Sequence, residues 1–197
     1  MSDPGAGERR APIRPPDPPL GSDRFLLRPL VASDAEAIYA ACQDPDIARW
    51  TTIPQPYLRE HATGFVADTI DAWEHGREPT FAMVDRASGR LIGCVGLRSD
   101  GASGHAMEIG YWTAPAGRGR GLTTEAVRLV SRWALLDLRA ERVGLLVYVG
   151  NEASARVAEK AGFRREGVLR RYSLQRGTPR DTIVHSLIRA DLAGLPD

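Results

Sequence analysis

A strand that ends in a glycine-rich loop, with a helix opening directly after it, constrains this chain more than any other feature. The run from Glu108 to Ala126 reads EIGYWTAPAGRGRGLTTEA. Its glycines leave backbone N–H groups bare at the start of the helix, where the helix macrodipole favours a negatively charged ligand. The run therefore predicts a phosphate-binding loop in a domain that mixes strands and helices.

Two common phosphate loops do not fit these residues. No Gly-Lys-Ser/Thr closes the run, so it is not a Walker A loop, and no acidic residue ends a following strand where a dinucleotide fingerprint needs one. A mobile Gly/Arg loop or an RGG-like nucleic-acid contact is the alternative interpretation, and the position between a strand and a helix disfavours it. A net charge of +1 also gives no global attraction to nucleic acid or membrane.

The patterning elsewhere predicts one domain between two tails. Residues 1–21 are rich in proline and are expected to form a disordered tail, residues 22–190 the domain, and residues 191–197 a C-terminal tail. In the domain, Ser33 and Glu36 form a capping-box pattern that predicts a helix to about residue 43. A loop containing Trp50 and two prolines is expected after it.

Hydrophobic periodicity predicts the remaining elements. Helices are expected over residues 58–75, from residue 122 to about 138, and from an N-cap at Asn151 to Gly162. Strands are expected over residues 24–28, 81–85, 91–97, 105–113, 142–149, 163–174 and 180–188. This order predicts an α/β domain with a largely antiparallel sheet and one crossover unit.

These segments resemble a known family. Residues 118–123 (RGRGLT) are similar to the Q/R-x-x-G-x-G/A pyrophosphate loop of GCN5-related N-acetyltransferases (GNAT), and residues 108–112 to the strand before it. Residues 151–163 resemble the N-x-x-S…E-K-x-G-F segment of the RimJ/RimL branch, and residues 24–30 its opening strand. The resemblance implies the GNAT fold, a mixed and mostly antiparallel sheet of about seven strands with about four helices and a V-shaped split between two central strands.

The resemblance also implies acetyl-CoA as the acyl donor. Backbone amides of the loop would hold the pyrophosphate, and strand backbone near Tyr111 would hold the pantetheine arm. The residues expected to bind the cofactor are Ile109, Tyr111, Trp112, Thr113, Arg118, Gly119, Arg120, Gly121, Leu122, Thr123 and Asn151. The match is imperfect at Thr123, which replaces a small residue, and at Ala158, where many members carry a tyrosine general acid.

Two side chains are candidates for catalysis. Glu108 is expected to act as the base that deprotonates the amine, through a water, and its alternative is a structural salt bridge with an arginine. Ser154 is expected to give a hydrogen bond to the leaving thiolate, or else to be an ordinary serine in the first turn of a helix. Asn151 is open to both an N-cap and a pantetheine contact. The four histidines have no metal-ligand spacing, so no metal is expected.

Aromatic residues are the candidates for the acceptor site. Trp50, Tyr57 and Tyr148 are expected to contact the substrate, and Trp73 is a further candidate. Core packing or a helix seam explains Trp50, Tyr57 and Trp73 equally well. Arginines crowd residues 164–180, where they form a solvated face or meet an acidic acceptor or the 3′-phosphate of the cofactor.

The function expected is acyl-CoA-dependent N-acyl transfer, from acetyl-CoA to a primary amine by direct attack through a tetrahedral intermediate. The acceptor is a protein N-terminus or a small amine, and the alternative function is a non-catalytic acyl-CoA-binding sensor. No nucleic-acid or membrane partner is expected, and a homodimer is left open. The lack of a signal peptide or apolar span, with only Cys42 and Cys94 as thiols, favours the cytoplasm, and an arginine-rich basic set with Lys160 as its one lysine is typical of a high-GC bacterial genome.

Overall fold

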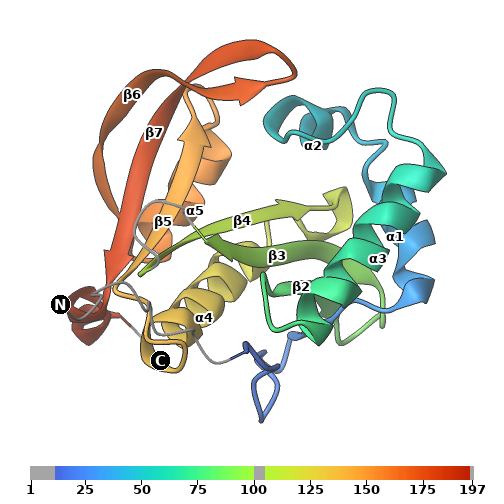
Figure 1. The fold of residues 1–197 in the computed structure, drawn as a ribbon, viewed down its shortest axis with the longest axis horizontal. Helices are drawn as coiled ribbons and strands as arrows, with labels where there is room; N and C mark the ends of the chain where they lie inside the picture. Colours follow the sequence, from blue (N-terminus) through green and yellow to red (C-terminus); the bar gives the residue numbers. More distant parts are fainter. Residues whose placement is uncertain (1–11, 100–104, 196–197) are drawn as a thin grey trace, which may run out of the picture.

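A single twisted sheet runs through the molecule (Figure 1). The computed structural model describes residues 12–99 and 105–195. Its seven strands lie in the order β1-β2-β3-β4-β5-β7-β6, and every neighbouring pair is antiparallel except the parallel pair β4 and β5. The strands are β1 (Phe25–Pro29), β2 (Thr80–Asp85), β3 (Leu91–Ser99), β4 (Ala106–Thr113), β5 (Arg142–Tyr148), β6 (Arg164–Gln175) and β7 (Thr178–Ile188). The predicted mixed, mostly antiparallel seven-stranded sheet is confirmed.

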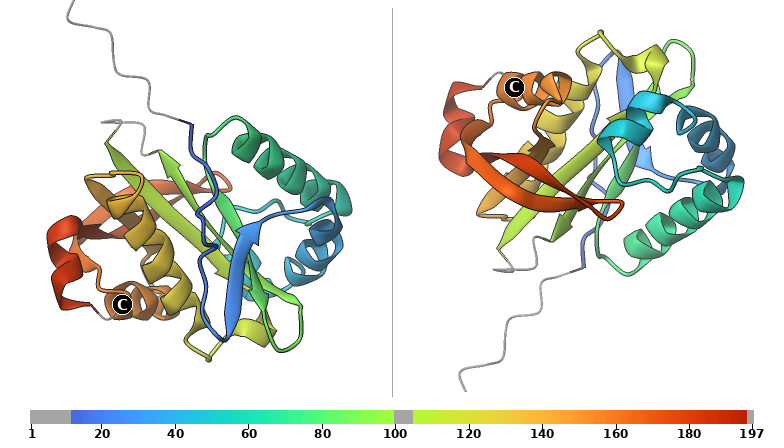
Figure 2. Two further views of the ribbon diagram at one scale, coloured as in Figure 1. Left: turned by 90° about the horizontal axis from the view of Figure 1, so that it is seen from below. Right: turned by 90° about the horizontal axis from the view of Figure 1, so that it is seen from above.

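Helices cover both faces of this sheet (Figure 2). A first core forms where α4 packs on the sheet, and α1 and α3 cover a second core on β1 to β4. The helices are α1 (Ala35–Ala41), α2 (Pro45–Trp50), α3 (Arg59–Glu74), α4 (Leu122–Leu136) and α5 (Glu152–Lys160). Within the described residues no helix is both long enough and apolar enough to cross a membrane.

The predicted start of the first helix is wrong in detail. Ser33 does not cap it; a short 3-10 turn, η1 (Ala32–Asp34), precedes α1. Asp34 is the organising side chain, since its carboxylate accepts the N–H of Val31 at 2.9 Å and a bidentate pair of bonds from Arg28 at 2.7 and 2.8 Å. The buried Asp34 carboxylate needs a charged partner, which Arg28 provides, and this pair organises the start of the helix in place of Ser33.

The region expected to be a loop around Trp50 contains the short helix α2. Asp44 is its N-cap, with Oδ1 accepting the N–H groups of Asp46 at 3.0 Å and Ile47 at 3.1 Å, and Pro45 occupies the first helical position. An Asp-Pro pair reads equally well as a helix stop and as a helix start, because proline suits the first turn. A helix can therefore begin directly after Asp44, where a loop was expected.

Both predicted tails are longer than the structure supports. In the described part of the N-terminal segment, Ile13 and Leu20 pack against the first core, and the Ile13 N–H donates to the carbonyl of Gly76 at 3.0 Å. At the other end, Leu192 and Leu195 join the same core. Residues 1–11 and 196–197 of the predicted tails lie outside the described residues. The folded unit therefore includes residues 12–21 and 191–195.

Candidate active site

A gap opens between the two parallel central strands. Strands β4 and β5 pair only from Ala106 opposite Arg142 to Glu108 opposite Gly144, and beyond that point they diverge (Figure 1). A cavity of about 860 Å³ occupies this gap and is lined by residues 108–113 of β4, residues 145–148 of β5, the glycine loop, α5 and the α2 region. The V-shaped split expected from the sequence is confirmed, and Glu108 lies at its apex.

The glycine loop forms an open cradle at the N-terminus of α4. Gly119 and Gly121 have φ values of +72° and +75°, a left-handed conformation that side-chain-bearing residues rarely adopt. A Cβ atom at either position would meet no atom within 4 Å, so the backbone conformation and not a lack of space favours glycine there. The exposed N–H groups and the helix dipole of α4 suit the pyrophosphate of CoA.

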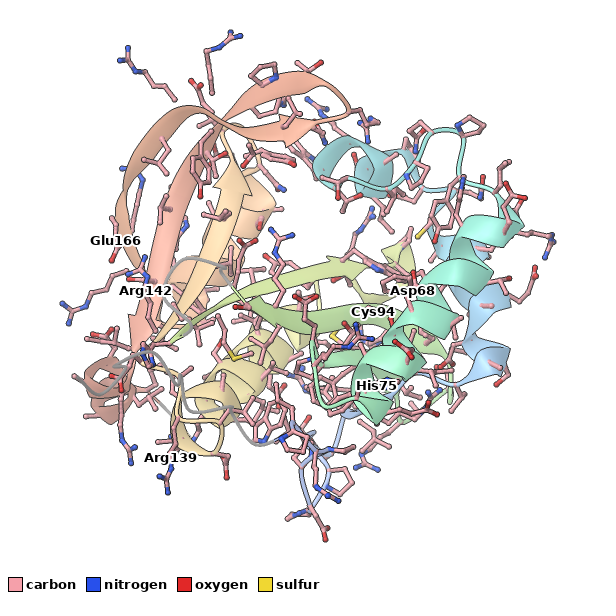
Figure 3. The ribbon with its side chains drawn as sticks, in the orientation of Figure 1. Asp68, His75, Cys94, Arg139, Arg142 and Glu166 are labelled. Atoms are coloured by element: carbon pink, nitrogen blue, oxygen red, sulfur yellow. The ribbon has the colours of Figure 1, made fainter. Side chains whose placement is uncertain are left out.

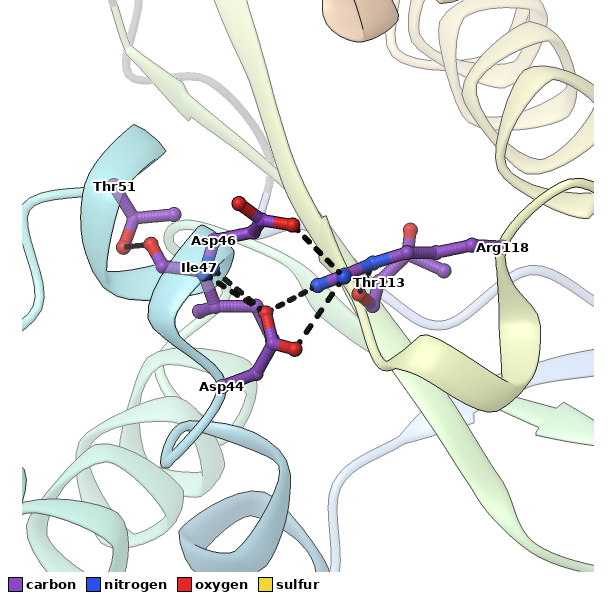
Figure 4. Close-up of polar contacts among 6 residues, drawn as sticks. All are labelled: Asp44, Asp46, Ile47, Thr51, Thr113 and Arg118. Atoms are coloured by element: carbon purple, nitrogen blue, oxygen red, sulfur yellow. Dashed lines mark hydrogen bonds and ion pairs between the residues drawn. The ribbon is translucent and has the colours of Figure 1, made fainter.

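The two arginines of this loop point away from the cradle. Arg118 donates to Asp44 Oδ1 at 2.6 Å and to the carbonyl oxygen of Thr113 at 3.1 Å, and it also approaches Asp46 at 3.4 Å (Figure 4). Arg120 pairs with the buried carboxylate of Asp85 at 2.7 Å. Both guanidinium groups therefore have carboxylate partners, and a role of these two residues in cofactor binding stays a prediction.

The other predicted cofactor residues in the loop and on β4 differ in how far they are buried. Leu122 is fully buried and lies outside the cavity lining, whereas Ile109, which is 2 % exposed, and the partly buried Trp112 both line the cavity. The hydroxyl of Thr123 shares a hydrogen bond of 2.8 Å with that of Thr113. This bond satisfies the extra hydroxyl at the imperfect position of the loop.

A pair of hydroxyl groups bridges the gap between β4 and α5. Tyr111 Oη and Ser154 Oγ share a hydrogen bond of 2.7 Å, and Asn151 Oδ1 accepts the N–H of Ser154 at 3.1 Å. Asn151 is thus the N-cap of α5, as predicted. Burial raises the pKa of Tyr111 to about 12, so its hydroxyl stays protonated at neutral pH.

The position that lacks the tyrosine of other family members is closed. Ala158 is completely buried, with a relative accessibility of 0 %, and packs in the first core. Ala158 is not among the residues that line the cavity. The hydroxyls that do line the cavity near α5 include that of Ser154, one turn earlier on the helix.

Glu108 has an arginine partner. Its carboxylate accepts a hydrogen bond from Arg98 of β3 at 2.6 Å, and the side chain of Glu108 is 20 % exposed while that of Arg98 is 62 % exposed. Both residues line the cavity. The salt bridge that was the alternative interpretation of Glu108 therefore exists, and it coexists with access to the cavity.

The three aromatic residues predicted to contact the acceptor come together. Trp50 at the end of α2, Tyr57 in the following loop and Tyr148 at the end of β5 all line the cavity. Trp73 does not, since it packs edge-on against Phe81 with ring centroids 5.1 Å apart in the core.

None of the arginines of residues 164–180 is among the residues that line the cavity. Arg164 pairs with Asp191 at 2.9 Å, and Arg176 donates to the carbonyl of Ala48 at 2.9 Å, so neither faces a cofactor phosphate. The basic side chains along the α5 wall of the cavity are Arg156 and Lys160. Their spacing of four residues on one helix is the signal that could have identified them.

Sequence reasoning also missed how α2 is held over the cavity. Gln175 at the tip of the β6–β7 hairpin donates from Nε2 to the carbonyls of Arg49 at 2.8 Å and Thr51 at 2.9 Å. Arg176 adds a cation at the same C-terminal end of the helix, where the dipole favours it. Together with Arg118 at the other end, these contacts fix a six-residue helix that would be marginal alone.

Within residues 12–99 and 105–195, no three His, Cys, Asp or Glu side chains are grouped so that they could hold a metal ion. The cavity presents a cradle for an anion, the Glu108 carboxylate, a hydroxyl pair and an aromatic wall. Such a set can bind a phosphorylated thioester and move protons at an amine and at a thiol.

Comparison with known proteins agrees with this arrangement. Residues 24–164 match the family model described as "Acetyltransferase (GNAT) domain". The chain is 32% identical to "Uncharacterized N-acetyltransferase YoaA" of Bacillus subtilis over 172 residues, covering 87% of this chain and 97% of that protein. It is 38% identical over 178 residues to "Probable N-acetyltransferase YjcK" of the same organism, covering 87% and 98%.

Solved structures show the same fold. Mycobacterium smegmatis RimJ in complex with CoA-disulfide superposes with a TM-score of 0.75 at 23% identity, covering 85% of this chain and 83% of that one. Ribosomal-protein-S5-alanine acetyltransferase from Vibrio fischeri gives a TM-score of 0.76 at 24% identity, covering 88% and 97%. The chain therefore belongs to the GNAT acetyltransferase family and is an N-acetyltransferase.

Proposed function

We propose that this protein transfers an acetyl group from acetyl-CoA to a primary amine in the gap between β4 and β5. The proposal rests on one observation: the glycine cradle, the Glu108 carboxylate and the Tyr111–Ser154 hydroxyl pair all line the same cavity. The cradle would hold the pyrophosphate. Beyond Glu108, the β4 backbone that faces the gap is released from β5 and would bind the pantetheine arm, while Arg156 and Lys160 suit a further phosphate.

Glu108 is proposed as the base. Alkylamines have a pKa near 10 and are mostly protonated at neutral pH, so a carboxylate that takes the proton generates the nucleophile. The partner Arg98 is largely exposed, and an ion pair with such a partner contributes only about 1 kcal/mol or less. An incoming ammonium group can therefore replace Arg98 beside the carboxylate at little cost.

Ser154 is proposed as the donor at the leaving thiolate. The amine attacks the thioester carbonyl of acetyl-CoA to form the N–C bond of a tetrahedral intermediate, and the C–S bond breaks when this intermediate collapses to the amide and the CoA thiolate. A thiol has a pKa near 8.5, so a hydroxyl hydrogen bond suffices to stabilise the thiolate until it is protonated. Tyr111 acts as a positioning residue, because the bond of 2.7 Å between the two hydroxyls holds Ser154 Oγ toward the gap.

Two acceptor classes are consistent with this site. The RimJ/RimL resemblance favours a protein N-terminus, whose α-amine has a pKa near 8 and asks less of a base. A small-molecule amine is favoured by the α2 helix and the β6–β7 hairpin tip, which meet over the cavity and narrow it. We propose that the acetyl transfer is common to both and that the cytoplasm is its location.

The test compares Glu108→Gln with Arg98→Gln. Both variants break the same salt bridge, but only the first removes the carboxylate. We expect Glu108→Gln to lower kcat for CoA release with an amine acceptor by about 100-fold or more, and Arg98→Gln to lower it far less. Acetyl-CoA affinity, measured by calorimetry, should be retained in both. Equal losses in the two variants would assign Glu108 a structural role and remove the proposed base.

A further inference from the structure

The cavity has an acceptor side lined by apolar side chains. On the side of the sheet covered by α1 and α3, the lining comes from Ile38, Cys42, Trp50, Ile53, Tyr57 and Phe65, which we call the apolar chamber. Ile38, Cys42 and Tyr57 are 1 %, 2 % and 7 % exposed, so the chamber continues the second core. Burial raises the pKa of Cys42 to about 11 and that of Tyr57 further still, so neither group is charged at neutral pH.

Charge around the chamber is unequal. Three carboxylates line the cavity, those of Asp46, Glu78 and Glu108. Glu108 is paired with Arg98 of β3, and Asp46 lies 3.4 Å from Arg118 of the glycine loop. The other cations of the lining lie on the glycine loop and on α5. A group that enters the chamber beside Glu108 is therefore favoured if it is cationic at one point and apolar elsewhere, and a carboxylate next to the amine is disfavoured.

We propose that the acceptor carries its primary amine next to a large apolar or aromatic substituent, which fills the chamber while the amine meets Glu108. This inference rests on the proposed acetyl transfer. The same chemistry can come from a peptide that begins with Leu, Met or Phe, or from a small arylalkylamine. A hydroxyl or carboxylate in place of the apolar substituent would lose its hydration without gaining a partner among Ile38, Ile53 and Phe65.

The test uses the wild-type protein, acetyl-CoA and acceptors that differ in one substituent. Tetrapeptides that begin with Leu or Phe are compared with the same peptides beginning with Ser or Asp, and phenethylamine is compared with ethanolamine. We expect kcat/KM for the apolar member of each pair to exceed that of the polar member by at least about tenfold, since each methylene in an apolar pocket contributes about that factor. Comparison of kcat/KM between the peptides and the small amines then shows whether the acceptor is a peptide N-terminus or a small arylalkylamine.

A matched pair of variants tests the chamber itself. Ile53→Asp places a charge in the half-buried loop of the chamber, whereas Leu58→Asp places the same charge on a nearby side chain that is 43 % exposed and outside the cavity lining. We expect Ile53→Asp to lower kcat/KM for the Leu peptide at least about tenfold with acetyl-CoA affinity retained, and Leu58→Asp to leave both near wild type.

The outcomes separate the two proposals. Transfer to Ser or Asp acceptors at equal or higher kcat/KM would overturn the apolar acceptor and leave acetyl transfer standing. An Ile53→Asp variant that is folded and fully active on the Leu peptide would overturn the chamber's role. If acetyl-CoA binds but no acceptor in the panel leads to CoA release, the proposed function itself would be overturned.

Discussion

Asp44 stabilises α2 in two separable ways, and its substitution gives a quantitative test of the packing. Its Oδ1 accepts two N–H groups at the helix N-terminus, at 3.0 and 3.1 Å, and also receives the Arg118 guanidinium at 2.6 Å. Asp44→Asn keeps an oxygen for the cap and removes the charge. Asp44→Ala removes both the cap and the charge, so the difference between the two variants isolates the cap.

The expected sizes follow from these contacts. Loss of an N-cap costs about 1 kcal/mol. The Arg118 side chain is 36 % exposed, so solvent screening limits the ion pair to about 1 kcal/mol. The free energy of unfolding should thus fall by about 1 kcal/mol in Asp44→Asn and about 2 kcal/mol in Asp44→Ala. At about 2–4 °C per kcal/mol for a chain of this size, Tm falls by about 2–4 °C and about 4–8 °C.

The pH dependence has a definite sign. The hydrogen bond from Arg118 lowers the pKa of Asp44 below its usual 3.8. A lowered folded-state pKa means that the charge contributes fully above pH 3.8 and that this contribution is lost as the pH falls through the folded value. The stability difference between wild type and Asp44→Asn should therefore shrink on acidification below that pH.

The assay is calorimetric or urea unfolding of wild type, Asp44→Asn, Arg118→Met and the double variant. The double-mutant cycle should give a coupling energy of about 1 kcal/mol between Asp44 and Arg118. Because Arg118 points to α2 and not into the cradle, Arg118→Met should change acetyl-CoA affinity by no more than about twofold. Asp44→Asn as stable as wild type, with no coupling to Arg118, would refute the ion-pair reasoning, and equal losses in Asn and Ala would refute the cap.

Three further outcomes follow from other contacts. Tyr111→Phe should lower kcat with little change in KM for acetyl-CoA, because Ser154 loses its orienting hydroxyl. An equal loss of kcat in Ser154→Ala and in the double variant would show that the two hydroxyls act as a unit. Additive losses would contradict this. Glu166 faces Arg142 at the edge of the sheet (Figure 3), and hydrogen bonds from Arg142 and Ser186 lower the pKa of Glu166 to about 2. Its contribution to stability of about 1 kcal/mol therefore holds above pH 4.5 and fades toward pH 2. In urea unfolding, Glu166→Gln should be less stable than wild type at pH 7 and should match it near pH 2. Ala158→Tyr should destabilise the fold by about 1–3 kcal/mol through overpacking and should not raise kcat, and a faster, stable variant would refute the assignment of this position to the core.

Elements with strong local patterns could be predicted from the sequence. The helix α3, the glycine loop and the N-cap of α5 at Asn151 all appear where expected, because caps, periodicity and turn residues act over a few neighbouring residues. The family resemblance added the parallel neighbours β4 and β5 and the gap between them. Glu108 and Ser154 could be named as candidates because the motifs place them, although their roles remain predictions.

Several features needed the tertiary structure. The helix α2 is six residues long and is held by Arg118 at one end and Gln175 at the other, from segments 74 and 126 residues away. Local propensity cannot predict a helix whose stability comes from such distant partners. The carboxylate partner of Arg118 could not be predicted for the same reason, because a side chain beside an anion cradle can as well reach a carboxylate on another element.

The sequence by itself determined an anion cradle at a helix N-terminus, and with the family resemblance it indicated acetyl-CoA, since backbone conformation and helix dipoles are properties of short segments. Only the tertiary structure decided which side chains face the cavity. It joined Tyr111 to Ser154 across 43 residues of chain, paired Glu108 with Arg98 and closed Ala158 into the core. These outcomes depend on packing between elements, where one strand register or one buried carboxylate sets the direction of a side chain.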